Sequence, residues 1–474
     1  MFLASLLGLR WGASLLAKRI DIFDMKRRLV LAFRSNLPKR SIRFARHVLL
    51  RMLCPIFLAL AQVGLLPQAG AAAPLAAWAE LIGPGSEASI RAIVPAEADC
   101  PAVIADGDPI PMRVRADPGP LFPSGKTPRA QFPVRVCELI APRGKASLTL
   151  EGLKLPLPVA DPQRIVVFGD TGCRMKLTRL QDCGEGWEYP EVAKHAAESR
   201  PDLVIHLGDY LYRESCSGSA VCQQRPTGYD WKIWNSDFFE PSRALFAAAP
   251  WIMVRGNHEI CDRAGEGWFR FLDHAPLPPE CVPMSAFFVV EPGNLGFVVA
   301  DSAQIARDGG RAPDKPPDDP IGKLQAFYAE VESTVPSPAW MLTHVPFNAP
   351  VRTFAGTIVS DTIQHRAIGE RLSRNIKMIL SGHVHMFEAL SFGGDKPPPS
   401  QLVVGTGGTE LDAPPDELPK INGSSVRNAF ILRHFCYMVW NREGLNWNGE
   451  LHNELGQPLA HCRLMERELS CQEN

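Results

Sequence analysis

The sequence predicts an α/β protein whose main domain is preceded by a small all-β domain. In residues 161–474, short apolar runs alternate with longer amphipathic segments, and several runs end in a polar residue. In residues 75–160, short apolar stretches are separated by Pro and Gly, and no long helical period occurs. The chain has 474 residues, 46% hydrophobic and 21% charged, which allows a large core and argues against general disorder.

Residues 1–71 are predicted to be a leader with a signal peptide. A basic stretch, residues 17–51, precedes an apolar run over residues 55–66 and small residues over 68–73. The apolar run is shorter than the about 20 residues that a membrane-spanning helix needs. We therefore expect cleavage after Ala71 and export to the periplasm or outside the cell. A retained N-terminal membrane anchor is the alternative.

The cysteines agree with export, because twelve are unusual in a cytosolic enzyme. Cys54 lies in the leader, and Cys436 is expected to be a buried thiol. The remaining ten are expected to form pairs that are near in the sequence; the alternative is that all are reduced. The expected pairs are Cys100–Cys137, Cys173–Cys183, Cys216–Cys222, Cys261–Cys281 and Cys462–Cys471.

The elements of residues 161–474 follow from the length and composition of each segment. Short runs of mainly aliphatic residues predict buried strands over 164–169, 202–208, 251–255, 287–290, 296–300, 340–343 and 376–380. Longer segments predict helices over 188–200, 242–249 and 321–335. From residue 429 onwards we expect edge strands that close the domain.

Potential metal ligands follow five of these strands. Alone, each has an ordinary explanation, since Asp caps turns and a single His is usually a core residue. Because ligands bind at the carboxyl ends of parallel strands, we expect all five segments at one edge of one sheet, around two metal ions. Asp209 is expected to bridge ions about 3.5–4 Å apart, and a turn at Gly382 to direct two histidines to different ions. The segments contain Asp170, Asp209, Asn257-His258-Glu259, His344 and His383-Val-His385.

These motifs, in this order, resemble the calcineurin-like metallophosphoesterases and, within them, the purple acid phosphatases. The resemblance covers about residues 161–474 and implies a β-sheet sandwich flanked by helices, with a β-sandwich before it. Most calcineurin-like members open with Asp-x-His, whereas this chain has Gly172 there and Tyr212 three residues after Asp209. This exchange is similar to that of the purple acid phosphatases, and a phenolate favours a trivalent ion.

The resemblance implies a ligand set and a reaction. Fe³⁺ would be held by Asp170, Asp209, Tyr212 and His385. The second ion, Fe²⁺, Zn²⁺ or Mn²⁺, would be held by Asp209, Asn257, His344 and His383. Both carboxylate and imidazole suit these metals. His258 would contact phosphate or protonate the leaving oxygen, with Glu259 orienting it or contacting substrate.

The implied activity is hydrolysis of small phosphate monoesters by attack of a metal-bound hydroxide. One alternative is a phosphodiesterase that acts on nucleotides or phospholipid head groups with the same metals. Another is a secreted binding protein without catalysis. The net charge of −1 gives no electrostatic argument for a nucleic-acid partner.

Two features of the sequence leave alternatives open. Purple acid phosphatases usually carry another active-site His about ten residues beyond the equivalent of His344, and this chain has Arg352 in that stretch. Arg352 either contacts phosphate or faces solvent. Tyr229, Trp231 and Trp234 either form a rim that selects substrate or pack their own loop down, which we favour.

Overall fold

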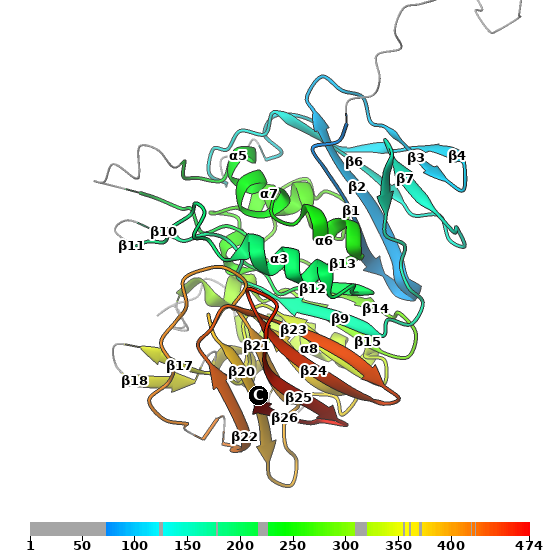
Figure 1. The fold of residues 1–474 in the computed structure, drawn as a ribbon. Helices are drawn as coiled ribbons and strands as arrows, with labels where there is room; N and C mark the ends of the chain where they lie inside the picture. Colours follow the sequence, from blue (N-terminus) through cyan, green and yellow to red (C-terminus); the bar gives the residue numbers. More distant parts are fainter. Residues whose placement is uncertain are drawn as a thin grey trace, which may run out of the picture. The chain divides into compact units, whose positions relative to one another are not determined.

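The computed structural model describes residues 73–122, 127–176, 179–216, 226–308, 320–353, 356–359, 362–368, 372–418, 420–421 and 423–474. The predicted leader lies outside these residues. From residue 71 onwards the chain forms one compact unit. In the described part the larger sheet has eleven strands, shown in Figure 1. In sheet order they are β26 (Glu468–Glu473), β25 (Pro458–Met465), β24 (Asn446–Asn453), β23 (Cys436–Glu443), β9 (Arg164–Phe168), β12 (Leu203–His206), β13 (Trp251–Met253), β1 (Ala76–Gly83), β2 (Glu87–Pro95), β6 (Val134–Ile140) and β5 (Arg113–Ala116).

A second sheet packs against the first. Its central strands β15, β16, β19 and β21 are parallel, as are β9, β12 and β13 of the first sheet. The ring of Trp340 on β16 lies 5.8 Å from that of Trp440 on β23 and 5.0 Å from that of Trp447 on β24. In sheet order, the second sheet contains β14 (Phe288–Val290), β15 (Gly296–Ala300), β16 (Ala339–Thr343), β19 (Ile376–Ser381), β21 (Ser400–Val404), β20 (Phe387–Gly393) and β22 (Ser425–Leu432).

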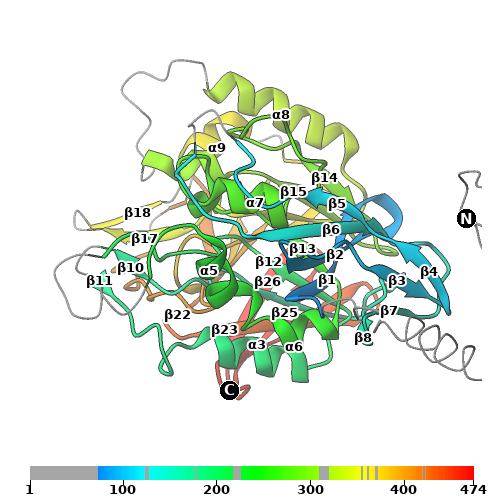
Figure 2. The same ribbon diagram turned by 90° about the horizontal axis from the view of Figure 1, so that it is seen from above.

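Helices cover the outer faces of this sandwich. Figure 2 shows α8 and α9 on one side, α3 and α6 on the other, and the strands between them. On α8, Phe327 and Tyr328 pack against Met341 of the second sheet, and on α3, Tyr189 packs against Phe168 of the first. The helical elements are η1 (Pro84–Ser86), α3 (Tyr189–Glu198), α5 (Trp231–Trp234), η2 (Asn235–Phe239), α6 (Arg243–Ala248), η3 (Asn257–Glu259), α7 (Gly265–Phe271), η4 (Ala303–Asp308), α8 (Pro320–Thr334) and α9 (Thr362–Ile368).

In the described part of residues 76–155, the regular elements are strands, apart from the short η1, as we expected for this segment. One face of β1 and β2 packs on a small antiparallel sheet, with Ile90, Val103 and Leu148 in a shared core. The edge of β1 pairs with β13, so the larger sheet continues across the boundary that we placed at residue 160. The division into two domains stays a prediction. The small sheet contains β4 (Asp108–Pro111), β3 (Ala102–Ala105), β7 (Leu148–Leu150) and β8 (Leu153–Leu155).

Two hairpins lie outside these three sheets. They are β10 (Met175–Lys176) with β11 (Arg179–Leu180), and β17 (Pro350–Thr353) with β18 (Gly356–Val359). Within the described residues, no helix is long and apolar enough to cross a membrane.

The predicted α/β fold is confirmed, and β22 and β26 are edge strands, as expected for the C-terminal segment. Two details of the strand prediction were wrong. The ligand-bearing strands belong to two sheets rather than one, with β9, β12 and β13 in the first and β16 and β19 in the second. In the C-terminal segment, β23 is an internal strand, because it pairs with both β9 and β24. Apolar composition alone does not say which sheet a buried strand joins.

Four of the expected disulfides are present, as is the buried thiol of Cys436. Cys216 is also disulfide-bonded, while its expected partner Cys222 lies outside the described residues. The four are Cys100–Cys137, Cys173–Cys183, Cys261–Cys281 and Cys462–Cys471.

Candidate metal centre

The predicted ligands lie where strands of both sheets end. Asp170 lies two residues after the end of β9, and Asp209 lies three residues after the end of β12. Both have left-handed backbone conformations, with φ of 57° and 59°. Such angles are uncommon outside Gly and cluster at functional sites. Here the amide of Asp170 bonds to Gly208 O and that of Thr171 to Asp209 O, so the two strand ends hold each other in place.

One cluster of side chains surrounds the hydroxyl of Tyr212. That oxygen lies 2.8 Å from Asp170 Oδ1, 2.6 Å from Asp209 Oδ2 and 2.9 Å from His385 Nε2. His385 Nδ1 lies 2.9 Å from the carbonyl oxygen of Glu410. Because a carbonyl only accepts, Nδ1 carries the proton in the neutral ring, and Nε2 turns its lone pair towards the cluster.

A second cluster adjoins the first through Asp209. His344 Nε2 lies 3.2 Å from Asp209 Oδ2 and 2.9 Å from Asn257 Oδ1, which in turn lies 2.9 Å from His383 Nδ1. Ligand atoms of Asp209, His344 and His383 all lie within 4.8 Å of one another. His344 Nδ1 donates to Leu207 O at 2.8 Å, so its Nε2 also presents a lone pair.

The donor set of both clusters fits cations. In the neutral rings of His344 and His385, the lone pairs of Nε2 face carboxylate oxygens. Two hydrogen-bond acceptors then oppose each other, unless a proton or a metal ion lies between them. The first cluster offers oxygens and one nitrogen, and the second offers two imidazoles, an amide and a carboxylate. Asp209 Oδ2 belongs to both. Imidazole and carboxylate are common ligands of Fe, Zn and Mn.

Glycines let the backbone approach the site. A Cβ on Gly382 would lie 2.3 Å from Asp170 Oδ2, and His383 beyond it has a φ of 69°. His383 and His385 accordingly reach different clusters, as we expected from this turn. A Cβ on Gly172 would lie 2.6 Å from Tyr210 O, so the backbone that leads to Tyr212 leaves no room for a side chain there.

The protein environment alone sets unusual pKa values at the site. Burial and the carboxylates of Asp170 and Asp209 raise the pKa of Tyr212 well above its ordinary value. Burial lowers the pKa of His344, but the Asp209 carboxylate outweighs burial and raises that pKa to about 9. Burial and the charge of His344 lower the pKa of His383 to about 3. The buried carboxylates therefore recruit positive charge, which a bound cation would also supply.

His258 lies beside the clusters without joining them. Its ring centroid is 3.9 Å from that of Tyr212, and its Nε2 is 4.0 Å from Asp209 Oδ2. Its backbone N–H donates to Asp209 Oδ1 at 2.8 Å. Burial lowers the pKa of His258 well below its ordinary value.

The carboxylate next to the His258 ring belongs to Glu214, whose Oε1 lies 3.3 Å from Nδ1. Our expectation that Glu259 orients His258 was wrong. Glu259 is fully buried and accepts from the backbone amides of Asp209, Tyr210 and Gly256. Its contact with substrate stays a prediction. Sequence reasoning missed Glu214, although it lies two residues after Tyr212.

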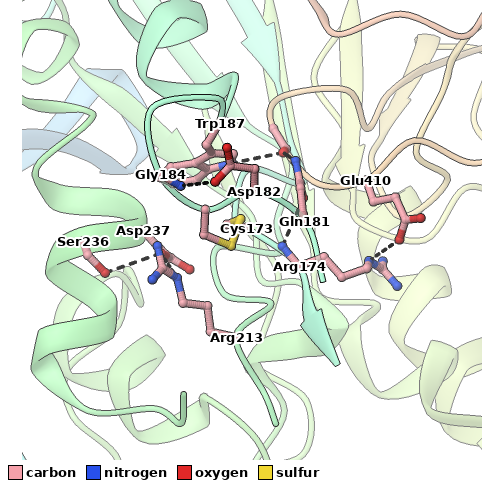
Figure 3. Close-up of a disulfide and its surroundings, with 12 residues drawn as sticks. Cys173, Arg174, Gln181, Asp182, Gly184, Trp187, Arg213, Ser236, Asp237 and Glu410 are labelled. Atoms are coloured by element: carbon pink, nitrogen blue, oxygen red, sulfur yellow. Dashed lines mark hydrogen bonds and ion pairs between the residues drawn. A yellow bond between two sulfur atoms is a disulfide. The ribbon is translucent and has the colours of Figure 1, made fainter. Parts of the chain in front are cut away.

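Two arginines near the site were also not predicted. The guanidinium of Arg174 lies 5.0 Å from the Tyr212 ring centroid, and its Nη2 is 3.3 Å from His385 Nδ1. Figure 3 shows Arg174 reaching towards Glu410 from beside the disulfide of Cys173. Arg263 Nε lies 3.0 Å from Glu214 Oε1. Arg174 thus contacts two of the predicted ligands, and Arg263 contacts the carboxylate beside His258.

The remaining candidates lie elsewhere. Arg352, on β17, is about half exposed and pairs with Asp416 at 3.2 Å; its contact with phosphate stays a prediction. Trp234 is fully buried and Trp231 packs against Phe239 and Phe271, as expected if these rings hold their loop down.

Comparison with known proteins identifies the class of this fold and site. Residues 163–387 match the family of calcineurin-like phosphoesterases. Residues 163–387 are thus similar to calcineurin-like phosphoesterases, and the chain is a metal-dependent phosphoester hydrolase.

A more particular likeness comes from a solved structure. The purple acid phosphatase PPD1 from yellow lupin (Lupinus luteus) seeds is similar with a TM-score of 0.54 and 13% identity, over 81% of this chain and 72% of that chain. At this identity the likeness concerns the fold. No curated protein matches the sequence significantly.

Two smaller structures also align, with TM-scores too low to support an argument. One is Vps29 with zinc from Entamoeba histolytica, at 0.25 and 11% identity, over 66% of this chain and 98% of that chain. The other is a phosphoesterase predicted in Streptococcus pneumoniae, at 0.24 and 12% identity, over 66% and 98%.

Proposed function

We propose that this protein is an exported phosphatase that hydrolyses small phosphate monoesters at a dinuclear metal centre. The observation that carries the proposal is the position of Asp209 Oδ2, which lies 2.6 Å from the Tyr212 hydroxyl and 3.2 Å from His344 Nε2. A single carboxylate oxygen shared by two ligand clusters is suited to bridge two ions. Asp170, Tyr212 and His385 would complete the first site, and Asn257, His344 and His383 the second.

The ligand types support different metals at the two positions. Two carboxylates lie in the first cluster, and the Tyr212 oxygen would join them as a phenolate once a metal ion displaced its proton; this concentration of negative charge favours Fe³⁺ there. The two imidazoles and the amide of the second cluster suit Fe²⁺, Zn²⁺ or Mn²⁺. Once bound, the two ions would polarise phosphate oxygens and lower the pKa of an attacking water.

The chain's own residues would then bind the ester and handle the proton of the leaving group. Since the Glu214 carboxylate faces Nδ1 of His258 at 3.3 Å, Nε2 is the ring atom on the side of Asp209. We propose that Nε2 gives its proton to the leaving oxygen, and that Glu214 stabilises the protonated ring. Arg174 would add positive charge for the phosphate.

Export is supported by the oxidised cysteines. Cys100–Cys137, Cys173–Cys183, Cys261–Cys281 and Cys462–Cys471 are disulfides, and such bonds persist mainly in oxidising compartments. The predicted leader gives the route. The mass of the mature protein tests this part, because a retained Met1 would contradict cleavage.

The first experiment on the metal centre is the visible absorption spectrum of the oxidised protein, measured with its metal content. We expect two ions per chain and a broad band from a phenolate bound to Fe³⁺, which disappears in Tyr212→Phe. Tyr210→Phe is the matched control, because Tyr210 is equally buried but its hydroxyl donates to Val254 O. A colourless wild-type protein with two metals would contradict the role of Tyr212.

The substrate class is tested by comparing turnover of 4-nitrophenyl phosphate with that of bis(4-nitrophenyl) phosphate. We expect the monoester to have the higher kcat/KM. A higher value for the diester would favour the alternative that the same centre cleaves nucleotides or phospholipid head groups. Absence of turnover with both, in protein that holds two metals, would support a binding protein.

A further inference from the structure

A cavity of about 330 Å³ lies at the far end of the second sheet from the metal centre. Its walls include Arg374, just before β19, and Lys396 in the turn between β20 and β21. Arg467, in the turn between β25 and β26, closes another side. The cavity is thus lined by three loops that lie far apart in the sequence.

Basic side chains predominate among the polar groups of this cavity. Among the described residues, the lining contains Arg374, Lys396 and Arg467 but one carboxylate, that of Asp395, and the imidazole of His365 also lines the wall. In the described part of the chain, Arg374, Lys396 and Arg467 form no ion pair. Elsewhere on this surface, Arg427 pairs with Glu468 and Arg463 with Glu443. Among the described residues of its lining, the cavity therefore holds more positive than negative side chains.

Arg467 is the best-fixed of the three cations. Its carbonyl oxygen accepts from Ser400 Oγ at 2.6 Å, and Ser400 Oγ accepts from Leu469 N at 3.1 Å, which ties the turn to β21. Its Nε is buried and, among the described residues, has no hydrogen-bond partner. Burial and the charge of Arg374 lower the pKa of Arg467. A buried donor without a partner destabilises the folded protein, so the site favours an acceptor.

We propose that this cavity is a second binding site, separate from the metal centre, for a phosphoryl oxyanion held by Arg374, Lys396 and Arg467. Guanidinium groups bind phosphate through paired, charge-assisted hydrogen bonds, and the ammonium adds a point charge. A volume of about 330 Å³ is at the lower end of small-molecule sites and accommodates phosphate with a small organic group. Ile368 and Leu372 supply an apolar wall for that group.

The two sites are too far apart to bind one phosphate. Arg374 precedes and His383 follows β19 (Ile376–Ser381), and six extended residues span about 20 Å. The metal centre, at one end of the second sheet, would thus bind the phosphoryl group that is cleaved. The cavity at the other end would bind a phosphoryl group without the help of metal ions. A product phosphate, or a phosphorylated molecule present at higher concentration, has the required chemistry.

The test counts inorganic phosphate bound to the metal-loaded full chain by equilibrium dialysis with radiolabelled phosphate at about 0.15 M ionic strength. We expect saturation at two phosphates per chain in the wild type and one in the double variant Arg374→Gln/Arg467→Gln. The matched control, Arg427→Gln/Arg463→Gln, removes the same charge from paired, exposed positions and should keep two. Hydrolysis of 4-nitrophenyl phosphate should be unchanged in both variants.

The difference of one phosphate between wild type and double variant is the decisive quantity. If the proposed metal centre bound no phosphate, the wild type would bind one phosphate and the double variant none. The difference between them would still test the cavity. An equal count in wild type and double variant would overturn the proposal, as would an equal loss in the control. If Arg467→Gln does not fold, Arg374→Gln/Lys396→Gln at exposed positions gives the same comparison.

Discussion

Replacing His258 by Ala separates its proposed role in proton transfer from any role in metal binding. The side chain stays outside both ligand clusters, since its Nε2 lies 4.0 Å from Asp209 Oδ2, whereas His344 Nε2 lies at 3.2 Å. Residue 258 does contact Asp209 through its backbone N–H, which donates to Oδ1 at 2.8 Å and which Ala retains. We therefore expect His258→Ala to keep both ions.

The expected loss follows from the kind of catalysis assigned to the ring. A positioned acid or base contributes about 10²–10⁴-fold, which corresponds to about 2.7–5.4 kcal/mol in the barrier. Glu214 acts on the reaction only through His258, and Gln has nearly the same shape as Glu. We therefore expect Glu214→Gln to lower kcat less than His258→Ala does, by about 10–100-fold. The pH profile gives a second readout. Without the Glu214 carboxylate at 3.3 Å, the protonated ring is less stable, and the alkaline limb should move to lower pH.

The assay is steady-state hydrolysis of 4-nitrophenyl phosphate, with metal content measured on the same samples. Full metal content with kcat lowered in both variants supports the roles of His258 and Glu214. Wild-type kcat in His258→Ala with both ions bound would refute the assignment. An unshifted profile in Glu214→Gln would leave Glu214 as a structural neighbour only.

Three further predictions concern the metals and stability. Asp209→Asn should lower metal content from two ions per chain towards none, because Oδ2 belongs to both clusters; retention of two ions would contradict a bridging role. Arg91→Met should reduce the free energy of unfolding by about 3–5 kcal/mol, since fully buried Arg91 binds Glu80 at 2.9 Å and two carbonyls; denaturant titration checks this. Burial raises the pKa of Glu80 to about 7 despite Arg91. The native state then holds this proton more tightly than the unfolded chain, so stability falls as pH rises from about 4.5 to 7. Thermal melts of Glu80→Gln should not show this fall in stability with rising pH. Parallel pH profiles of melting temperature for the wild type and Glu80→Gln would contradict the prediction.

The N-terminal β segment shows how far sequence reasoning reaches and where it stops. The alternation of short apolar stretches with Pro and Gly predicted strands over residues 75–160, and the structure has them. It did not reveal that β1 pairs with β13 or that Arg91 binds the carbonyls of Phe271 and Asp273. Hydrogen bonds between segments about 180 residues apart leave no local pattern in either segment.

At the candidate metal centre, the types of the proposed ligands and their places after strands could be predicted from the sequence. Each strand is a continuous apolar run, and the polar residue that ends it is visible as Asp170, Asp209 or His344. Only the tertiary structure decided that two sheets supply these ends, because a buried strand carries no mark of its sheet. It also decided that Glu214, rather than Glu259, faces His258. Glu259 is adjacent in sequence, but its carboxylate is taken up by three backbone amides, and the chain direction after Tyr212 brings Glu214 to the ring.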